Sequence, residues 1–147
     1  MTIVVVATDE EYKLAKKRFK HKPIIKTGVG GLNVIHRLRH IPKWVKIINF
    51  GYAGSNNITK GREVSIGFCM SYHPNVDYLE PAYIINDKNS TLWCYTSNDF
   101  VLDTDIKETC VFDMELAYIC ALGFKNVKSI KIISDNLSLN EYMEEIK

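Results

Sequence analysis

Apolar and polar positions alternate in blocks along the chain, with short runs rich in Val, Ile and Phe between amphipathic stretches. The first run, residues 2–7 (TIVVVA), is continuously apolar, which is typical of a strand buried on both faces of a parallel sheet. The same pattern predicts further strands at 23–28, 45–54, 63–72, 83–85, 91–96, 108–112 and 127–134. Helical spacing predicts helices over 9–19, 31–40, 114–122 and 137–147.

This alternation of strands and helices predicts an α/β fold, a three-layer sandwich around a twisted, mostly parallel central sheet. The 147 residues contain no internal repeat or linker, so we expect a single domain over 1–147. In such sheets, ligands bind at the carboxyl ends of the strands. That rule points to four segments, at 8–11, 51–55, 97–101 and 134–136.

Composition and charge narrow the possible functions. The formal net charge of +2 is too small to indicate nucleic-acid binding, and the basic run at 13–22 fits a solvated helix face. No apolar run approaches the ~18 residues of a membrane span. The first residues lack the basic segment of a signal peptide, so a cytoplasmic protein is expected.

Neither a metal nor a cofactor is indicated. The four cysteines form no CxxC pair and lie in apolar segments, which predicts buried free thiols and no zinc site. His36 and His40 have the i, i+4 spacing of two metal ligands, but an acidic third ligand is missing nearby.

An acidic residue in an apolar helix is the most unusual feature of the chain. Glu115 follows Asp113 at the start of the predicted helix, within a run that is apolar on all sides. Asp113 as a helix N-cap, with Glu115 favouring the helix dipole, is one interpretation. A carboxylate rarely enters such surroundings without a partner, however, so a ligand-binding role is the other.

Three further segments also allow both a structural and a functional interpretation. The segment TGVGGLNV (27–34) has Asn33 where a dinucleotide fingerprint requires its third glycine, so it predicts either a tight turn or a close backbone approach to a ligand. The small residues of NFGYAGS (49–55) favour an open floor for a ligand. Ser134, Asp135 and Asn136 suit either a helix cap or a general acid facing a cleft.

Together these segments resemble the nucleoside phosphorylase and nucleosidase superfamily, and most closely its methylthioadenosine/S-adenosylhomocysteine nucleosidases. FDMELAYIC (112–120) is similar to the family's V[ED]MEGAAIA, and IKIISDNLS (130–138) to VRAISDxAD. TIVVVATDEEY, TGVGGLNV, INFGYAGS, SYHPNVD and TSNDFV match other family segments in the same order. The resemblance implies the phosphorylase/hydrolase-like fold and a nucleoside substrate.

The resemblance also implies roles for three carboxyl groups. Glu115 would accept a hydrogen bond from the ribose 2′-hydroxyl, and Asp135 would be the general acid at purine N7. Glu11 would be the base that activates water, although a one-residue offset in the first turn leaves Glu10 as an alternative. Cleavage of an N-glycosidic bond needs such an acid and a base in opposite protonation states.

Other residues would bind the substrate by the same resemblance. Phe100 would stack on the base, and the remaining contacts would come from Met114, Val101, Val29, Ala53, Gly54, Ser134 and Lys131. Tyr72 and His73 would reach the site of a neighbouring subunit, because the family forms homodimers or larger homo-oligomers. Lys131 stands where the nucleosidases carry Arg and lacks its bidentate fork.

Hydrolysis by water is the expected reaction. The phosphorylases need a cationic phosphate site after the first strand, and this chain has the acidic ATDEEYKLA there. A purine nucleoside phosphorylase and a non-catalytic nucleoside-binding protein of the same fold remain as alternatives. The chain is shorter than members of the family, with losses expected around 74–90 and in the final helix, and Tyr52 replaces a small Ser, which together imply a more open, altered pocket.

Overall fold

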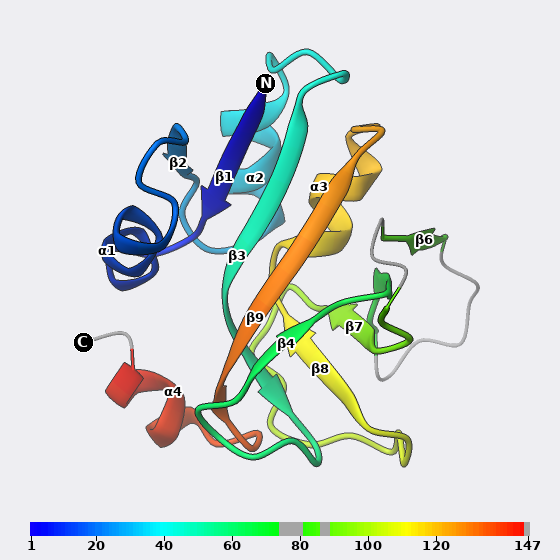
Figure 1. Ribbon diagram of the computed structural model, residues 1–147. Helices are drawn as coiled ribbons and strands as arrows, with labels where there is room; N and C mark the ends of the chain where they lie inside the picture. The colour runs from blue at the N-terminus through cyan, green and yellow to red at the C-terminus, as the bar shows by residue number, and fades with distance from the viewer. Residues whose placement is uncertain (74–80, 86–88, 146–147) are drawn as a thin grey trace.

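A computed structural model describes residues 1–73, 81–85 and 89–145 of the protein. Strands and helices alternate as predicted (Figure 1). The strands are β1 (Thr2–Val6), β2 (Ile24–Lys26), β3 (Lys46–Ser55), β4 (Glu63–Ser65), β5 (Phe68–Ser71), β6 (Ala82–Ile84), β7 (Trp93–Thr96), β8 (Cys110–Asp113) and β9 (Val127–Asp135). The helices are α1 (Asp9–Arg18), α2 (Gly31–Leu38), α3 (Leu116–Ala121) and α4 (Leu139–Glu145).

The described strands form one mixed, nine-stranded sheet with the order β2-β1-β3-β8-β7-β5-β6. The long strand β3 also pairs with β9, and β9 pairs with β4. Pairing is parallel for β1 with β2 and β3, for β3 with β9, and for β7 with β5 and β8. It is antiparallel where β3 meets β8, where β4 meets β9, and where β5 meets β6.

Helices cover both faces of the sheet because its central strands are apolar on both sides. On β1, Val4 and Val6 pack with Ala15 of α1, whereas Val5 packs on the opposite face with Val34 of α2 and Leu116 of α3. Figure 1 shows α1 on one side of the sheet and α2 and α3 behind it. Successive residues of a strand point to opposite faces, so a continuously apolar strand produces this three-layer sandwich. The predicted fold class is confirmed.

The single strand predicted over 63–72 is wrong, because the chain changes partner within it. β4 pairs with β9, and β5 pairs with β7 and β6. Gly67 lies between the two strands, where a Cβ atom would come within 2.7 Å of the carbonyl carbon of Ser90. This close backbone approach allows the chain to leave one partner and join the next.

The predicted start of the third helix is also wrong. Asp113 is the last residue of β8, and α3 begins only at Leu116. Glu115 is the residue before the helix, with φ −133°, and its side chain makes no capping hydrogen bond. The carboxylate of Asp113 nevertheless accepts a hydrogen bond from the Leu116 N–H at 2.8 Å. Met114 and Glu115 therefore lie in the turn between a strand and a helix, where their side chains can face a ligand.

No helix among the described residues is long and apolar enough to cross a membrane.

Candidate active site

A cavity lies where the carboxyl ends of β1, β3 and β9 meet the turn that follows β8. Nine of the residues predicted from the sequence line it: Glu11, Val29, Ala53, Gly54, Phe100, Val101, Met114, Glu115 and Asp135. Its other described lining residues are Ala7, Tyr52, Asp99, Phe112, Asp113 and Tyr142. Segments more than 100 residues apart in the chain thus bring three candidate carboxyl groups to one cavity.

Glu11 is held rigidly by the backbone at the start of α1. Its Oε1 accepts hydrogen bonds from the N–H groups of Ala7 (2.8 Å) and Thr8 (3.0 Å), and its Oε2 accepts one from Tyr52 N–H (2.7 Å). Thr8 caps the helix and completes a capping box with Glu11. Burial raises the pKa of Glu11, against the hydrogen bond from Tyr52 and the charge of Lys131, which lower it. Glu10 forms a surface pair with Lys13 and does not line the cavity.

Glu115 finds its partner in the glycine-rich turn. Its Oε2 accepts a hydrogen bond from the backbone N–H of Gly30 at 2.8 Å. Gly28 and Gly30 have φ values of 91° and 93°, so the turn needs glycine at both positions. Burial, together with the nearby charge of Asp113, raises the pKa of Glu115 to about 8. The predicted tight turn is confirmed, and its backbone approaches a carboxyl group.

Asp135 ends β9 and is buried. Its Oδ2 accepts a hydrogen bond from the Ser134 hydroxyl at 2.7 Å, and its Oδ1 accepts one from the Leu137 N–H at 2.9 Å. Leu137 adopts a positive φ of 66°, which turns the chain back toward the carboxylate. Burial raises the pKa of Asp135 even though both hydrogen bonds favour the charged form.

A buried ion pair lies behind the cavity. The ammonium of Lys131 donates a hydrogen bond to Asp113 Oδ2 at 3.0 Å, and the Thr96 hydroxyl donates one to Asp113 Oδ1 at 2.5 Å. Burial alone would raise the pKa of Asp113, but Lys131 and Thr96 outweigh it and lower that pKa. For Lys131, burial alone would lower the pKa, but the charge of Asp113 outweighs burial and raises that pKa. The pair is therefore ionised.

Two glycines of β3 leave room for the carboxyl groups. A Cβ atom on Gly51 would lie 2.7 Å from the carboxyl carbon of Glu11, and one on Gly54 would lie 2.8 Å from Oδ1 of Asp135. Both positions therefore need glycine for space. The small residues of NFGYAGS, expected to leave space for a ligand, also leave space for the side chains of Glu11 and Asp135.

Three predicted substrate contacts lie outside the described lining. Lys131 is 1% exposed and is occupied by Asp113, so the structure places it in support of the site. Ser134 is buried and supports Asp135. His73, next to Tyr72 after β5, is not among the described lining residues, and residues 74–77 of the same predicted segment lie outside the described residues. The reach of Tyr72 and His73 into a neighbouring subunit stays a prediction.

The sequence analysis overlooked Tyr142 of α4 and Asp99. Tyr142 packs against Phe100, with 5.1 Å between the ring centroids and an angle of 47° between the ring planes. Helical spacing gave no signal for Tyr142, because Asp135 ends β9 and α4 begins only at Leu139.

The fold is that of known nucleosidases. The chain aligns with the 5′-methylthioadenosine/S-adenosylhomocysteine nucleosidase of S. pneumoniae at a TM-score of 0.75 and 18% identity, covering 99% of this chain and 92% of that one. For the MTAN of Chlamydia trachomatis the TM-score is 0.77 at 14% identity, with coverages of 97% and 87%. For the futalosine hydrolase of Helicobacter pylori it is 0.74 at 12% identity, with 99% and 90%.

This structural likeness confirms the predicted three-layer α/β sandwich. No protein-family model matches the chain, and a search of curated proteins finds no similar sequence. Because identities of 12–18% establish only the fold, an activity must be argued from the site itself.

Proposed function

We propose that the protein hydrolyses the N-glycosidic bond of a purine nucleoside, such as methylthioadenosine or S-adenosylhomocysteine. The observation that carries the proposal is the lining of one cavity by Glu11, Glu115 and Asp135. The names of the similar structures, which are nucleosidases and a futalosine hydrolase, support the same class of reaction.

In this proposal the reaction separates charge between the purine and the ribose, and each of the three carboxyl groups acts on a different part of the substrate or on the attacking water. As the C1′–N9 bond breaks, its electrons pass to the purine, and Asp135 donates a proton to N7. Burial, which raises the pKa of Asp135, favours the protonated form that this step requires. Glu115 orients the ribose through a hydrogen bond with its 2′-hydroxyl. Glu11 accepts the proton of the water that attacks C1′.

Water is favoured over phosphate because of the charge around the cavity. Five carboxyl groups, of Glu11, Asp99, Asp113, Glu115 and Asp135, line it, and its described lining includes no Lys, Arg or His. Lys131 lies behind the lining and already pairs with Asp113. A phosphate dianion would therefore face carboxyl groups with no cationic side chain in the described lining to bind it. This supports hydrolysis over phosphorolysis.

We propose that the cavity walls move when a substrate enters. The cavity measures about 30 Å³, which is room for about two water molecules. The ring pair formed by Phe100 and Tyr142 joins the 97–101 segment to α4 on one side of it. We propose that these two rings separate to admit a nucleoside and then pack against it.

A nucleoside panel with product analysis tests the activity. The purified protein is incubated with methylthioadenosine, S-adenosylhomocysteine, adenosine and inosine, with and without phosphate, and the products are identified by mass spectrometry. Free sugar formed without phosphate supports the proposal. Sugar 1-phosphate would show phosphorolysis instead, and binding without turnover would show a non-catalytic protein.

The acid role of Asp135 has its own variant. Asp135→Asn should lower kcat by about 10²–10⁴-fold with little change in substrate Kd, because the amide lacks the proton to give. Asp105→Asn is the matched control, since Asp105 is exposed and outside the described lining. Full activity in Asp135→Asn would contradict the assignment.

We further propose that the protein works in the cytoplasm as a homodimer or larger homo-oligomer. All four cysteines are free and buried, which suits a reducing compartment. Large apolar side chains on the surface, among them Leu32 at 83% and Ile84 at 82% exposure, are available for contacts between subunits. Sedimentation equilibrium that yields only the 16.9 kDa monomer at micromolar concentration would contradict the oligomer.

A further inference from the structure

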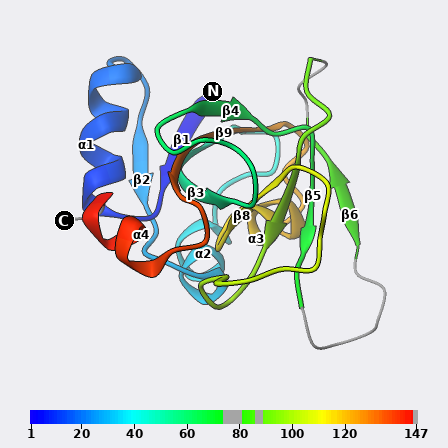
Figure 2. The same cartoon turned by 90° about the horizontal axis from the view of Figure 1, so that it is seen from below.

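Tyr142 is the one aromatic residue that α4 contributes to the described lining of the cavity. Its ring packs against Phe100, and α4 follows directly after the carboxyl end of β9 (Figure 2). The side chain shares the lining with Glu11, Glu115 and Asp135. Any ligand that reaches those three carboxyl groups therefore also meets Tyr142.

The Tyr142 hydroxyl is a neutral donor among acidic groups. Burial, then the negative charges of Glu11 and Glu115, raise the pKa of Tyr142 to about 12, so its proton stays in place. Among the described residues the hydroxyl makes no hydrogen bond, although its backbone N–H bonds to Ser138. A half-buried hydroxyl next to a binding cavity can donate to a ligand at little cost in desolvation.

The ribose oxygens that the proposed function leaves without a partner favour the sugar end of a bound nucleoside as the acceptor. In the proposed function Asp135 meets the purine, whereas Glu115 takes the 2′-hydroxyl and Glu11 the attacking water. Tyr142 shares the cavity lining with Glu11 and Glu115, the two groups that the proposed function assigns to the attacking water and the sugar. The ribose oxygens left without an assigned partner are then those at the 3′ and 5′ positions.

We propose that Tyr142 is a substrate-binding residue that donates a hydrogen bond to the 3′- or 5′-oxygen of the ribose and selects nucleosides carrying that oxygen. This inference rests on the proposed function. It makes the sugar's substitution pattern, rather than the purine alone, a determinant of specificity. If the 5′-oxygen is the acceptor, nucleosides with a 5′-hydroxyl are preferred over 5′-thioethers, because thioether sulfur is a weak acceptor.

The test compares wild type with Tyr142→Phe, which keeps the ring packed on Phe100 and removes only the hydroxyl. Kd by calorimetry and kcat/KM are measured for adenosine, 3′-deoxyadenosine, 5′-deoxyadenosine and methylthioadenosine. Tyr142→Phe should raise the Kd for adenosine by about fivefold to tenfold, which corresponds to the loss of one hydrogen bond. The loss should vanish for the deoxy nucleoside that lacks the acceptor, which tells the 3′ position from the 5′ position.

Tyr12→Phe is the control, because Tyr12 lies on α1, packs against the core cluster of Val4 and Phe50, and is not part of the described lining. An equal effect of Tyr142→Phe on adenosine and on both deoxy nucleosides, or no effect on any, would overturn the inference and leave the hydrolase intact. Wild-type protein that neither binds nor cleaves any of the four nucleosides would overturn the proposed function, and this inference with it.

Discussion

Glu115 is a buried acidic residue whose surroundings make it a candidate for substrate binding. A carboxyl group with one backbone hydrogen bond, next to the charge of Asp113, is costly to ionise, and the pKa of Glu115 rises to about 8 as a result. Asp113 avoids the same cost because Lys131 and Thr96 satisfy it. The contrast between these two neighbours separates a carboxylate that is neutralised within the fold from one that we propose to bind the substrate.

Glu115→Gln should remove a pH-dependent penalty on stability. In the unfolded chain a glutamate has a pKa of about 4.3, so folding raises its pKa and favours the protonated form. The contribution of Glu115 is therefore favourable below pH ~4 and is lost as pH rises to about 8. The free energy of unfolding of Glu115→Gln should exceed that of wild type by a margin that grows over this range, by up to ~1.4 kcal/mol for each pH unit, and its melting temperature should rise accordingly.

The exposed Glu108→Gln serves as the control for the loss of a charge. Differential scanning calorimetry between pH 4 and pH 9 gives both curves. A difference between Glu115→Gln and wild type that does not change with pH would contradict the raised pKa.

At the scale of elements, β3 holds the site together. It pairs with β1, β8 and β9, and two of its glycines border carboxyl groups that come from α1 and β9. Gly51 faces Glu11, and Gly54 faces Asp135. The two glycines pack no side chain within the strand, and the space that they leave is filled by two buried acidic side chains.

Gly51→Ala should damage activity more than stability. The added methyl group would force the Glu11 carboxyl out of its hydrogen bonds to Ala7, Thr8 and Tyr52. A displacement of this kind at a catalytic group costs about 10²-fold in kcat/KM. Steady-state kinetics with the best nucleoside of the panel measures the effect.

Gly61→Ala is the matched control with the opposite pattern. Gly61 has open space around it but a φ of 91°, so alanine costs about 1–2 kcal/mol of stability through the backbone. It does not belong to the described lining, so kcat/KM should hold. Equal losses of activity in the two variants would contradict the role given to Gly51.

For the molecule as a whole, the sequence predicted most of the layers but not how the strands pair. Continuous apolar runs such as 2–7 identify buried strands, and they do so because both faces of the central sheet are covered. Local patterns carry no information about partners, so the break of 63–72 at Gly67 and the antiparallel contact of β3 with β8 could not be seen. The burial of Lys131 was hidden for the same reason, because it depends on Asp113 from another strand.

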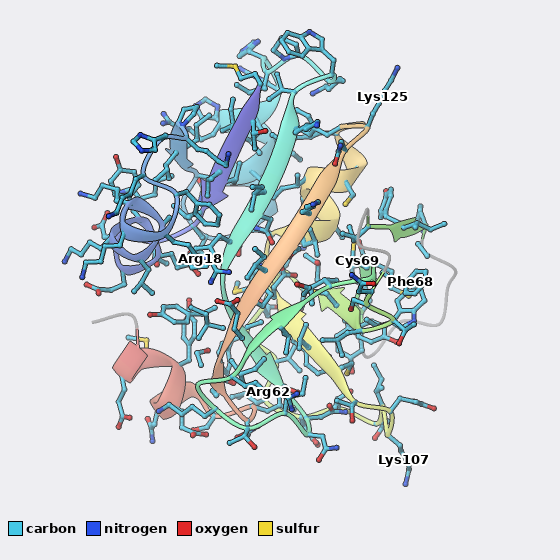
Figure 3. The ribbon with its side chains drawn as sticks, viewed as in Figure 1. Arg18, Arg62, Phe68, Cys69, Lys107 and Lys125 are labelled. Atoms are coloured by element: carbon cyan, nitrogen blue, oxygen red, sulfur yellow. The ribbon has the colours of Figure 1, made fainter. Side chains whose placement is uncertain are left out.

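Charge is also distributed at this scale in a way that composition conceals. The net charge is +2, and basic side chains such as Lys107 and Lys125 project from the surface (Figure 3). The cavity, by contrast, is lined by five carboxyl groups. The three candidate carboxyl groups were found from the resemblance and not from charge patterns, whereas Tyr142 depends on where a short final helix folds back, which spacing alone does not determine.

The capping box at the start of α1 gives Glu11 two duties. The same carboxyl group that faces the cavity also ties down the first turn of a helix, through Thr8 and Ala7. A non-catalytic protein of this fold would still need a glutamate at position 11 to stabilise the start of α1. The presence of Glu11 is therefore weak evidence for catalysis. Asp135 accepts hydrogen bonds only from Ser134 and from Leu137 in the turn that follows it. The effect of replacing Asp135 is therefore the more informative test of catalysis.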